Sequence, residues 1–183
     1  MARHRSPAAR TPRPLDPARL EELALSYAAR FATSAAKLEA YLVRKLRERG
    51  WEGERPPDPG AIAERFVELG YLDDEAYARA KSGGLLRRGY GPRRVTQALA
   101  AAGIAEEVRE EVRAGEGEVR RAAVAFAARR RFGPWGAEAD REVRQRQFAA
   151  MLRAGHGFDA ARAVIDAASV TAAEQWAAEA EEN

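Results

Sequence analysis

Apolar residues recur at intervals of three and four along most of the chain, which is the spacing of amphipathic helices. The first series is Leu20, Leu23, Tyr27 and Phe31, and it follows an Asp16-Pro17 pair suited to cap and begin a helix. No segment of strand length alternates apolar with polar residues. The pattern therefore predicts an all-α protein.

Helix-ending glycines divide this pattern into three rounds, each with two longer helices and one shorter helix. Gly50, Gly103 and Gly155 lie 53 and 52 residues apart, and each is followed within three positions by a large apolar residue. Units of this size bury a small core and stack on their neighbours. We expect three tandem three-helix repeats in an elongated, curved array, with boundaries at residues 17–72, 73–114 and 115–170.

The two ends of the chain lack this periodicity. Residues 1–16 are rich in Pro, Arg, Ser and Ala, which predicts a disordered basic tail. Solubility is its expected role, and added DNA affinity is the alternative. Residues 171–183 are expected to form an acidic C-terminal tail. No apolar run is long enough to span a membrane, and the N-terminus lacks the apolar core of a secretory signal, so we expect a soluble cytoplasmic protein with no membrane partner.

Composition argues against several kinds of chemistry. The chain has no cysteine, which excludes disulfides and thiolate sites, and its only histidines are His4 and His156. His156 lies between two glycines, where a capping or surface role is expected rather than metal ligation. No phosphate-binding loop or serine-nucleophile motif occurs. We therefore expect neither a metal, a cofactor nor an enzymatic activity, although any two of the 28 carboxylates could meet in space.

The chain has a net charge of only +3, but its basic and acidic residues are strongly segregated along the sequence. Residues 76–104 hold six basic side chains, Lys81 among them, and no acid, whereas residues 106–118 hold six acids against two arginines. Such sorting creates a local field even in a nearly neutral molecule. The basic stretch is thus a candidate binding surface, and the acidic stretch is a candidate docking surface for a different partner.

The sequence "LLRRGYGPRRVTQALAAAGI" (85–104) places four arginines around a Gly-Tyr-Gly-Pro turn. Arg87 and Arg88 close one helix, where cations suit the negative end of the helix dipole. Arg93 and Arg94 begin the next helix, where acids are preferred, so folding does not explain them. A helix start with free N–H groups and two arginines would suit a phosphate or carboxylate group. Tyr90 either packs under the turn or stacks on a partner, and packing is favoured.

A second basic cluster, Arg129, Arg130 and Arg131, precedes another Gly-Pro turn in "RRRFGPWG" (129–136). The helix end explains these arginines in part. Their position echoes that of Arg87 and Arg88, so we expect two basic corners along one face of the array. Such a face suits an extended polyanionic or filamentous partner.

Two segments resemble the RecX family of bacterial regulatory proteins. "FVELGYLDDEAYARA" (66–80) and "RRGYGPRRVTQALAAAGI" (87–104) carry the resemblance, and "FAAMLRAGHGFDAARAVI" (148–165) follows the family outline with His156 where an aromatic residue is usual. The resemblance spans roughly residues 20–168.

The resemblance implies a non-enzymatic, monomeric protein that binds the RecA recombinase. Family members lodge in the groove of the RecA filament on DNA and lower its ATPase and strand-exchange activities, and some bind single- or double-stranded DNA directly. The expected contacts are Lys81, Tyr90 and the arginines described above. Two other functions stay open: a DNA-binding helical protein that acts without RecA, and a helical adaptor that docks another protein on residues 106–118.

Overall fold

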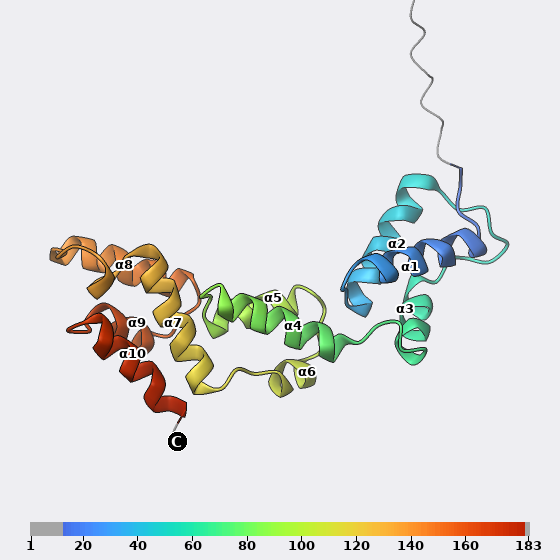
Figure 1. Ribbon diagram of the computed structural model, residues 1–183. Coiled ribbons are helices and arrows are strands. Elements are labelled where there is room, and N and C mark those ends of the chain that lie inside the picture. The colour runs from blue at the N-terminus through green and yellow to red at the C-terminus, as the bar shows by residue number, and fades with distance from the viewer. Residues whose placement is uncertain (1–12, 182–183) are drawn as a thin grey trace, which may run out of the picture. The chain divides into compact units, whose positions relative to one another are not determined.

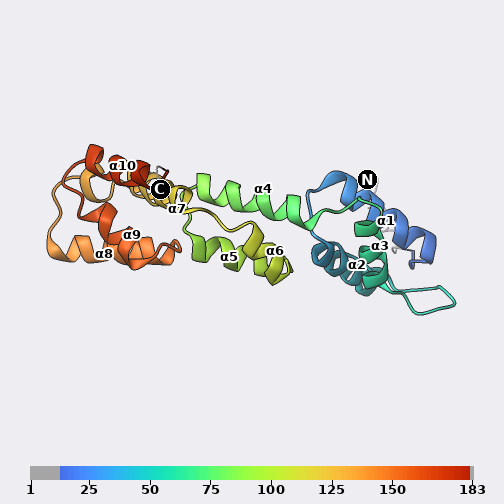
Figure 2. The same cartoon turned by 90° about the horizontal axis from the view of Figure 1, so that it is seen from below.

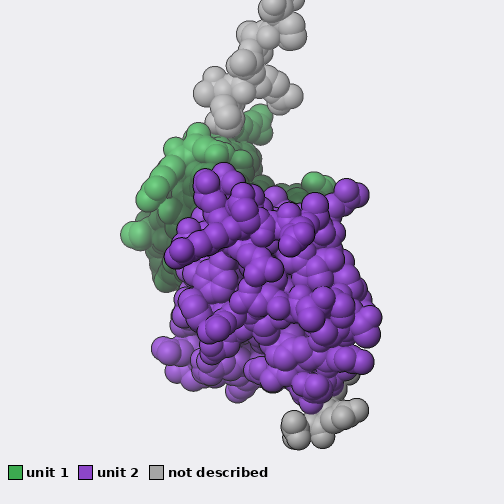
Figure 3. Space-filling model, turned by 90° about the vertical axis from the view of Figure 1, so that its left-hand side faces the viewer, with its two compact units in different colours: residues 1–73 green, residues 74–183 purple. Residues whose placement is uncertain are grey.

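The computed structural model describes residues 13–181, and all regular elements within that range are helical (Figure 1). The all-α prediction is confirmed. One compact unit ends at Asp73 and a second begins at Asp74 (Figure 3). The α-helices of the first unit are α1 (Pro17–Arg30), α2 (Ala35–Arg49) and α3 (Pro59–Glu68). Those of the second are α4 (Asp74–Arg87), α5 (Pro92–Ala100), α6 (Glu106–Glu111), α7 (Glu116–Arg130), α8 (Arg141–Arg153), α9 (Phe158–Ile165) and α10 (Val170–Ala178), with 3-10 turns at Gly133–Trp135 and Glu179–Glu181.

Side-chain caps fix the three helices of the first unit. Asp16, Ser34 and Asp58 each accept a hydrogen bond from the backbone N–H three residues later, at the starts of α1, α2 and α3. The helices pack around a core of large side chains, including Leu20, Leu38, Leu42 and Phe66. Burial of each such side chain contributes about 1.5–3 kcal/mol, so this unit has a substantial core of its own.

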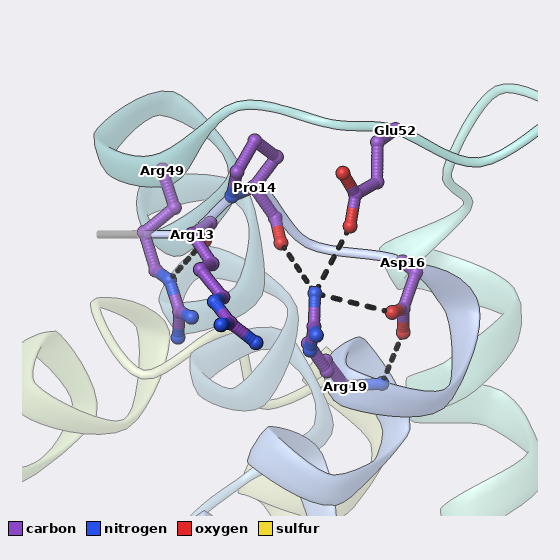
Figure 4. Close-up of polar contacts among 6 residues, drawn as sticks. All are labelled: Arg13, Pro14, Asp16, Arg19, Arg49 and Glu52. Atoms are coloured by element: carbon purple, nitrogen blue, oxygen red, sulfur yellow. Dashed lines mark hydrogen bonds and ion pairs between the residues drawn. The ribbon is translucent and has the colours of Figure 1, made fainter. Parts of the chain in front are cut away.

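The segment before α1 is ordered from residue 13, which corrects the prediction of disorder through residue 16. Leu15 is fully buried, donates its N–H to the carbonyl of Gly50 at 2.9 Å and accepts from the N–H of Glu52 at 2.9 Å. Arg19 ties down the same segment by reaching the Pro14 carbonyl and the carboxylates of Asp16 and Glu52 (Figure 4). Leu15 is a single apolar residue among prolines, so no periodic pattern in the sequence could indicate that it is buried. Residues 1–12 of the expected tail lie outside the described range.

The second unit contains two smaller cores that share α7. One surrounds Leu86, Val95, Leu99 and Ile104, and Ala122 of α7 reaches it. The other surrounds Ala123 and Ala127 of α7 together with side chains of α8 and α9. Figure 2 shows α4 and α5 side by side, with α7 following toward α8 and α9. Together with the core of the first unit, the described chain has three helical cores, which is consistent with three repeats.

The last helix extends the fold beyond the predicted end of the third repeat. Helix α10 begins at Val170 and continues into residues 171–183, which were expected to be an acidic tail. It packs on α7 and buries Ala173 and Ala177. The ring of Trp176 lies 4.8 Å from the Arg120 guanidinium, which also donates to the Trp176 carbonyl. The buried residues of α10 are small alanines, so the sequence of this helix shows little of the apolar periodicity that predicts a helix.

Candidate partner-binding surface

The Gly-Tyr-Gly-Pro turn between α4 and α5 is the joint between two of the helical groups. Gly89 has a φ of 78°, and a Cβ placed there would lie 2.8 Å from the backbone nitrogen of Phe126 in α7. A Cβ on Gly91 would overlap the Gly155 carbonyl in the turn after α8. Both glycines are therefore required because backbones meet directly at this joint.

His156 lies inside the joint and not at the surface, which corrects the sequence-based expectation. Its side chain is fully buried, and its Nε2 donates to the Gly89 carbonyl at 2.9 Å. The Phe126 ring lies 5.7 Å away, and Nδ1 is buried with no hydrogen-bond partner. Burial lowers the pKa of His156, against the opposing influence of the hydrogen bond to Gly89. A neutral imidazole thus holds the turn in place.

The start of α5 does not offer free N–H groups, so the expected anion site at this helix start is absent. The N–H of Gly91 donates to the Ala154 carbonyl at 2.9 Å, and that of Arg93 donates to the Gly155 carbonyl at 3.2 Å. The C-terminal end of α8 therefore meets the N-terminal end of α5. The negative end of the α8 dipole therefore lies beside the backbone of Arg93 and Arg94, at a helix start where the sequence left two basic residues unexplained.

The two basic clusters lie together and are not separate corners. The Arg129 guanidinium at the end of α7 donates to the Arg87 carbonyl at the end of α4, at 3.4 Å. Arg88 folds back onto its own helix and donates to the Gly84 carbonyl at 3.1 Å. The two helix ends thus hold their arginines in one region of the second unit.

Seven exposed arginines define what we call the arginine surface. Within residues 13–181, none of them has a carboxylate within ion-pair distance, whereas Arg19, Arg65 and Arg120 do. A carboxylate partner would reduce the field of each guanidinium, so the arginine surface keeps its charge for an external anion. Its members are Arg87, Arg88, Arg93, Arg94, Arg129, Arg130 and Arg131.

A groove of about 450 Å³ lies beside Tyr90. Its walls include Arg88, Arg94 and Gln97, and its apolar lining comes from Leu85 and neighbouring alanines of α5. Tyr90 is half-buried and lines the groove.

The remaining candidates occupy the margins of this region. Lys81 lies two helical turns before Arg88 on α4, with its ammonium 5.5 Å from the Tyr77 ring. Arg130 covers the Phe126 ring at 5.7 Å, and Arg131 ends α7 with a φ of 56°. Sequence reasoning missed Gln97 and Gly155, since their roles depend on which helices meet.

Among residues 13–181, no group of His, Asp and Glu side chains is arranged to hold a metal ion. Within these residues, no helix is both long enough and apolar enough to cross a membrane.

Comparison with known proteins identifies the family. Residues 73–112, which hold α4 to α6, match the family described as RecX, second three-helix domain. The Regulatory protein RecX of Myxococcus xanthus (strain DK1622) is 34% identical over 165 residues, which cover 85% of this chain and 88% of that protein. The chain belongs to the RecX family.

Further RecX proteins agree with this assignment. The Regulatory protein RecX of Halorhodospira halophila (strain DSM 244 / SL1) is 37% identical over 131 residues, covering 69% of this chain and 76% of the relative. The crystal structure of RecX from Lactobacillus salivarius superposes with a TM-score of 0.62 at 18% identity, over 81% of this chain and 93% of that one. The structural likeness concerns the fold. The match to the RecX second domain includes Arg87, Arg88, Arg93 and Arg94.

Proposed function

We propose that this protein is a regulator that binds RecA and its filament on DNA and lowers RecA ATPase and recombinase activity. The observation that carries the proposal is the arginine surface, whose seven guanidinium groups are exposed and lack carboxylate partners. The names of its relatives, Regulatory protein RecX, support a regulatory role without catalysis.

The arginine surface suits a large charged partner. Unpaired guanidinium groups favour carboxylate and phosphate groups through bidentate hydrogen bonds, and a cluster of them also accelerates encounter with an acidic surface. The tandem repeats, in the elongated array predicted from the sequence, would extend such contacts along a filament. In this proposal the protein acts as a monomer in the cytoplasm, on a cytoplasmic partner.

Charge reversal tests the arginine surface. The variant Arg93→Glu/Arg94→Glu should lose about tenfold or more of its inhibition of RecA ATPase, because two attractive charges become repulsive. The matched control is Arg146→Glu/Arg162→Glu, which changes the net charge equally at exposed, ion-paired positions of α8 and α9. The control should inhibit like the unmodified protein. Full inhibition by a folded Arg93→Glu/Arg94→Glu variant would remove these residues from the mechanism.

A second candidate function is DNA binding without RecA. It is favoured by the same unpaired arginines and by Tyr90, since cationic grooves with an aromatic side chain bind single-stranded nucleic acid. Affinity for bare single- and double-stranded DNA, measured at two salt concentrations, separates the two functions. Strong salt-dependent DNA binding with no effect on RecA would favour the second one.

A further inference from the structure

A second concavity lies between α5 and α6. This cleft has a volume of about 500 Å³. Val95, Leu99 and Val112 supply its apolar lining, and Arg93 and Arg109 also line it. Thr96 and Gln97 add groups that can exchange hydrogen bonds with a peptide backbone. The cleft therefore combines an apolar surface with guanidinium groups from two helices.

Arg109 is the unusual residue of this cleft. It is half-buried, and its Nε is shielded from solvent with no hydrogen-bond acceptor. Helix α6 is rich in glutamates, yet none of them accepts from Arg109, and Glu110 pairs instead with Arg113 at 2.9 Å. A buried donor without an acceptor is costly, most of all when it belongs to a charged group. Arg109 thus lines the cleft with a guanidinium group that has no carboxylate partner among the described residues.

We propose that the α5–α6 cleft binds a peptide segment of a protein partner in which a carboxylate side chain stands next to an aliphatic one. The aliphatic group packs against Val95, Leu99 and Val112. The carboxylate accepts hydrogen bonds from the guanidinium of Arg109, with Arg93 providing a second positive charge. Identifying the partner as RecA rests on the proposed function, whereas the chemistry of the cleft does not.

The charges around the cleft favour a peptide over a nucleic acid. Helix α6 carries four glutamates, at positions 106, 107, 110 and 111. A nucleic acid would bring a row of phosphates against these carboxylates, and like charges at close range disfavour binding. Glu110 also lines the cleft but is ion-paired with Arg113, so a peptide with a single carboxylate meets three arginines against one paired glutamate.

The variant Arg109→Met tests the role of the guanidinium, because it keeps the aliphatic stem and removes the unpaired donor. Its affinity for RecA filaments should fall about tenfold, as expected for the loss of a charge-assisted hydrogen bond. Its Tm should stay the same or rise, and its affinity for single-stranded DNA should not change. The matched control is Arg146→Met on α8, which should leave all three quantities unchanged.

A titration without RecA tests the cleft itself. The probe is the capped tripeptide acetyl-Leu-Glu-Leu amide, with acetyl-Leu-Gln-Leu amide as its neutral control. Only the acidic probe should shift the NMR signals of the Val95, Leu99 and Val112 methyl groups and of the Arg109 Nε–H, and Arg109→Met should abolish the shift.

Each outcome of these two experiments is decisive. Equal shifts from both peptides, or none at these residues, overturn the cleft proposal. A loss of DNA affinity or a lower Tm in Arg109→Met also overturns it, in favour of phosphate binding or of a structural role. If the unmodified protein does not bind RecA but binds the acidic probe, the proposed function fails and the cleft stands.

Discussion

The two compact units hold their short helices together by different kinds of contact. The first unit fills one core with large side chains and uses surface ion pairs, such as Arg65 with Glu21, between its helices. The second unit joins two small cores through direct backbone contact at Gly89, Gly91 and Gly155. Its arginine surface has no carboxylate partners within the described residues.

The two units differ in which groups join their helices, and therefore in which charges remain available to a partner. In the first unit, ion pairs between charged side chains, such as Arg65 with Glu21, help to join the helices. In the second, hydrogen bonds between the α5 and α8 ends do the joining, so the arginines beside them need no internal partner. The joint can therefore present positive charge without losing its own stability.

Adding a methyl group at the joint should have the largest effect. Gly91→Ala places a Cβ into the Gly155 carbonyl and should cost the second unit about 3 kcal/mol, at the upper end of overpacking effects. Hydrogen exchange resolved by residue checks that the loss is confined to the second unit.

Gly84→Ala is the matched control, because a Cβ there meets nothing within 4 Å and the residue lies inside α4. It should stabilise the second unit by about 0.5–1 kcal/mol, through the higher helix propensity of alanine. Equal stability of the Gly91→Ala variant and the unmodified protein would show that the joint is not rigid.

Acid should weaken the second unit before the first. The pKa of His156 is lowered in the folded protein from its ordinary value of 6.5. Just below pH 6.5, His156 is therefore protonated in the unfolded chain but stays neutral in the folded protein. Stability is complete above about pH 6.5 and falls by up to about 1.4 kcal/mol per pH unit below it, until the folded pKa is reached.

Urea unfolding followed by residue-resolved exchange between pH 8 and 5 measures this slope in each unit. The first unit has no histidine within residues 13–73 and should change much less in this range. The variant His156→Phe should flatten the slope of the second unit, and an unchanged slope would assign it to other groups.

Breaking a surface ion pair should have the smallest effect. Arg65→Gln removes the pair with Glu21, whose side chains are 46% and 55% exposed, and should change the free energy of unfolding by less than about 1 kcal/mol. Arg88→Gln should be equally neutral for folding but should weaken inhibition of RecA. If both variants inhibit RecA to the same extent, the arginine surface has no special role.

Much of the fold follows from local patterns. The Asp16-Pro17 start and the apolar spacing within each helix locate most helices correctly. The sequence pattern did not predict the burial of Leu15 or the packing of α10, because an isolated leucine and small alanines have no periodic signal. Only their packing partners in the fold show that these residues are buried. Charge sorting along the chain singles out residues 76–104, which hold four of the seven arginines of the arginine surface.

The sequence by itself determined the helices, their glycine ends and the acid-free basic stretch, because these depend on residues within one or two helical turns. Only the tertiary structure decided that the end of α8 meets the start of α5 and that His156 is buried. It also placed Arg129 against Arg87 and left Arg109 without an acceptor. These contacts join residues far apart in the chain, and their energies depend on distance in space, which no local pattern encodes.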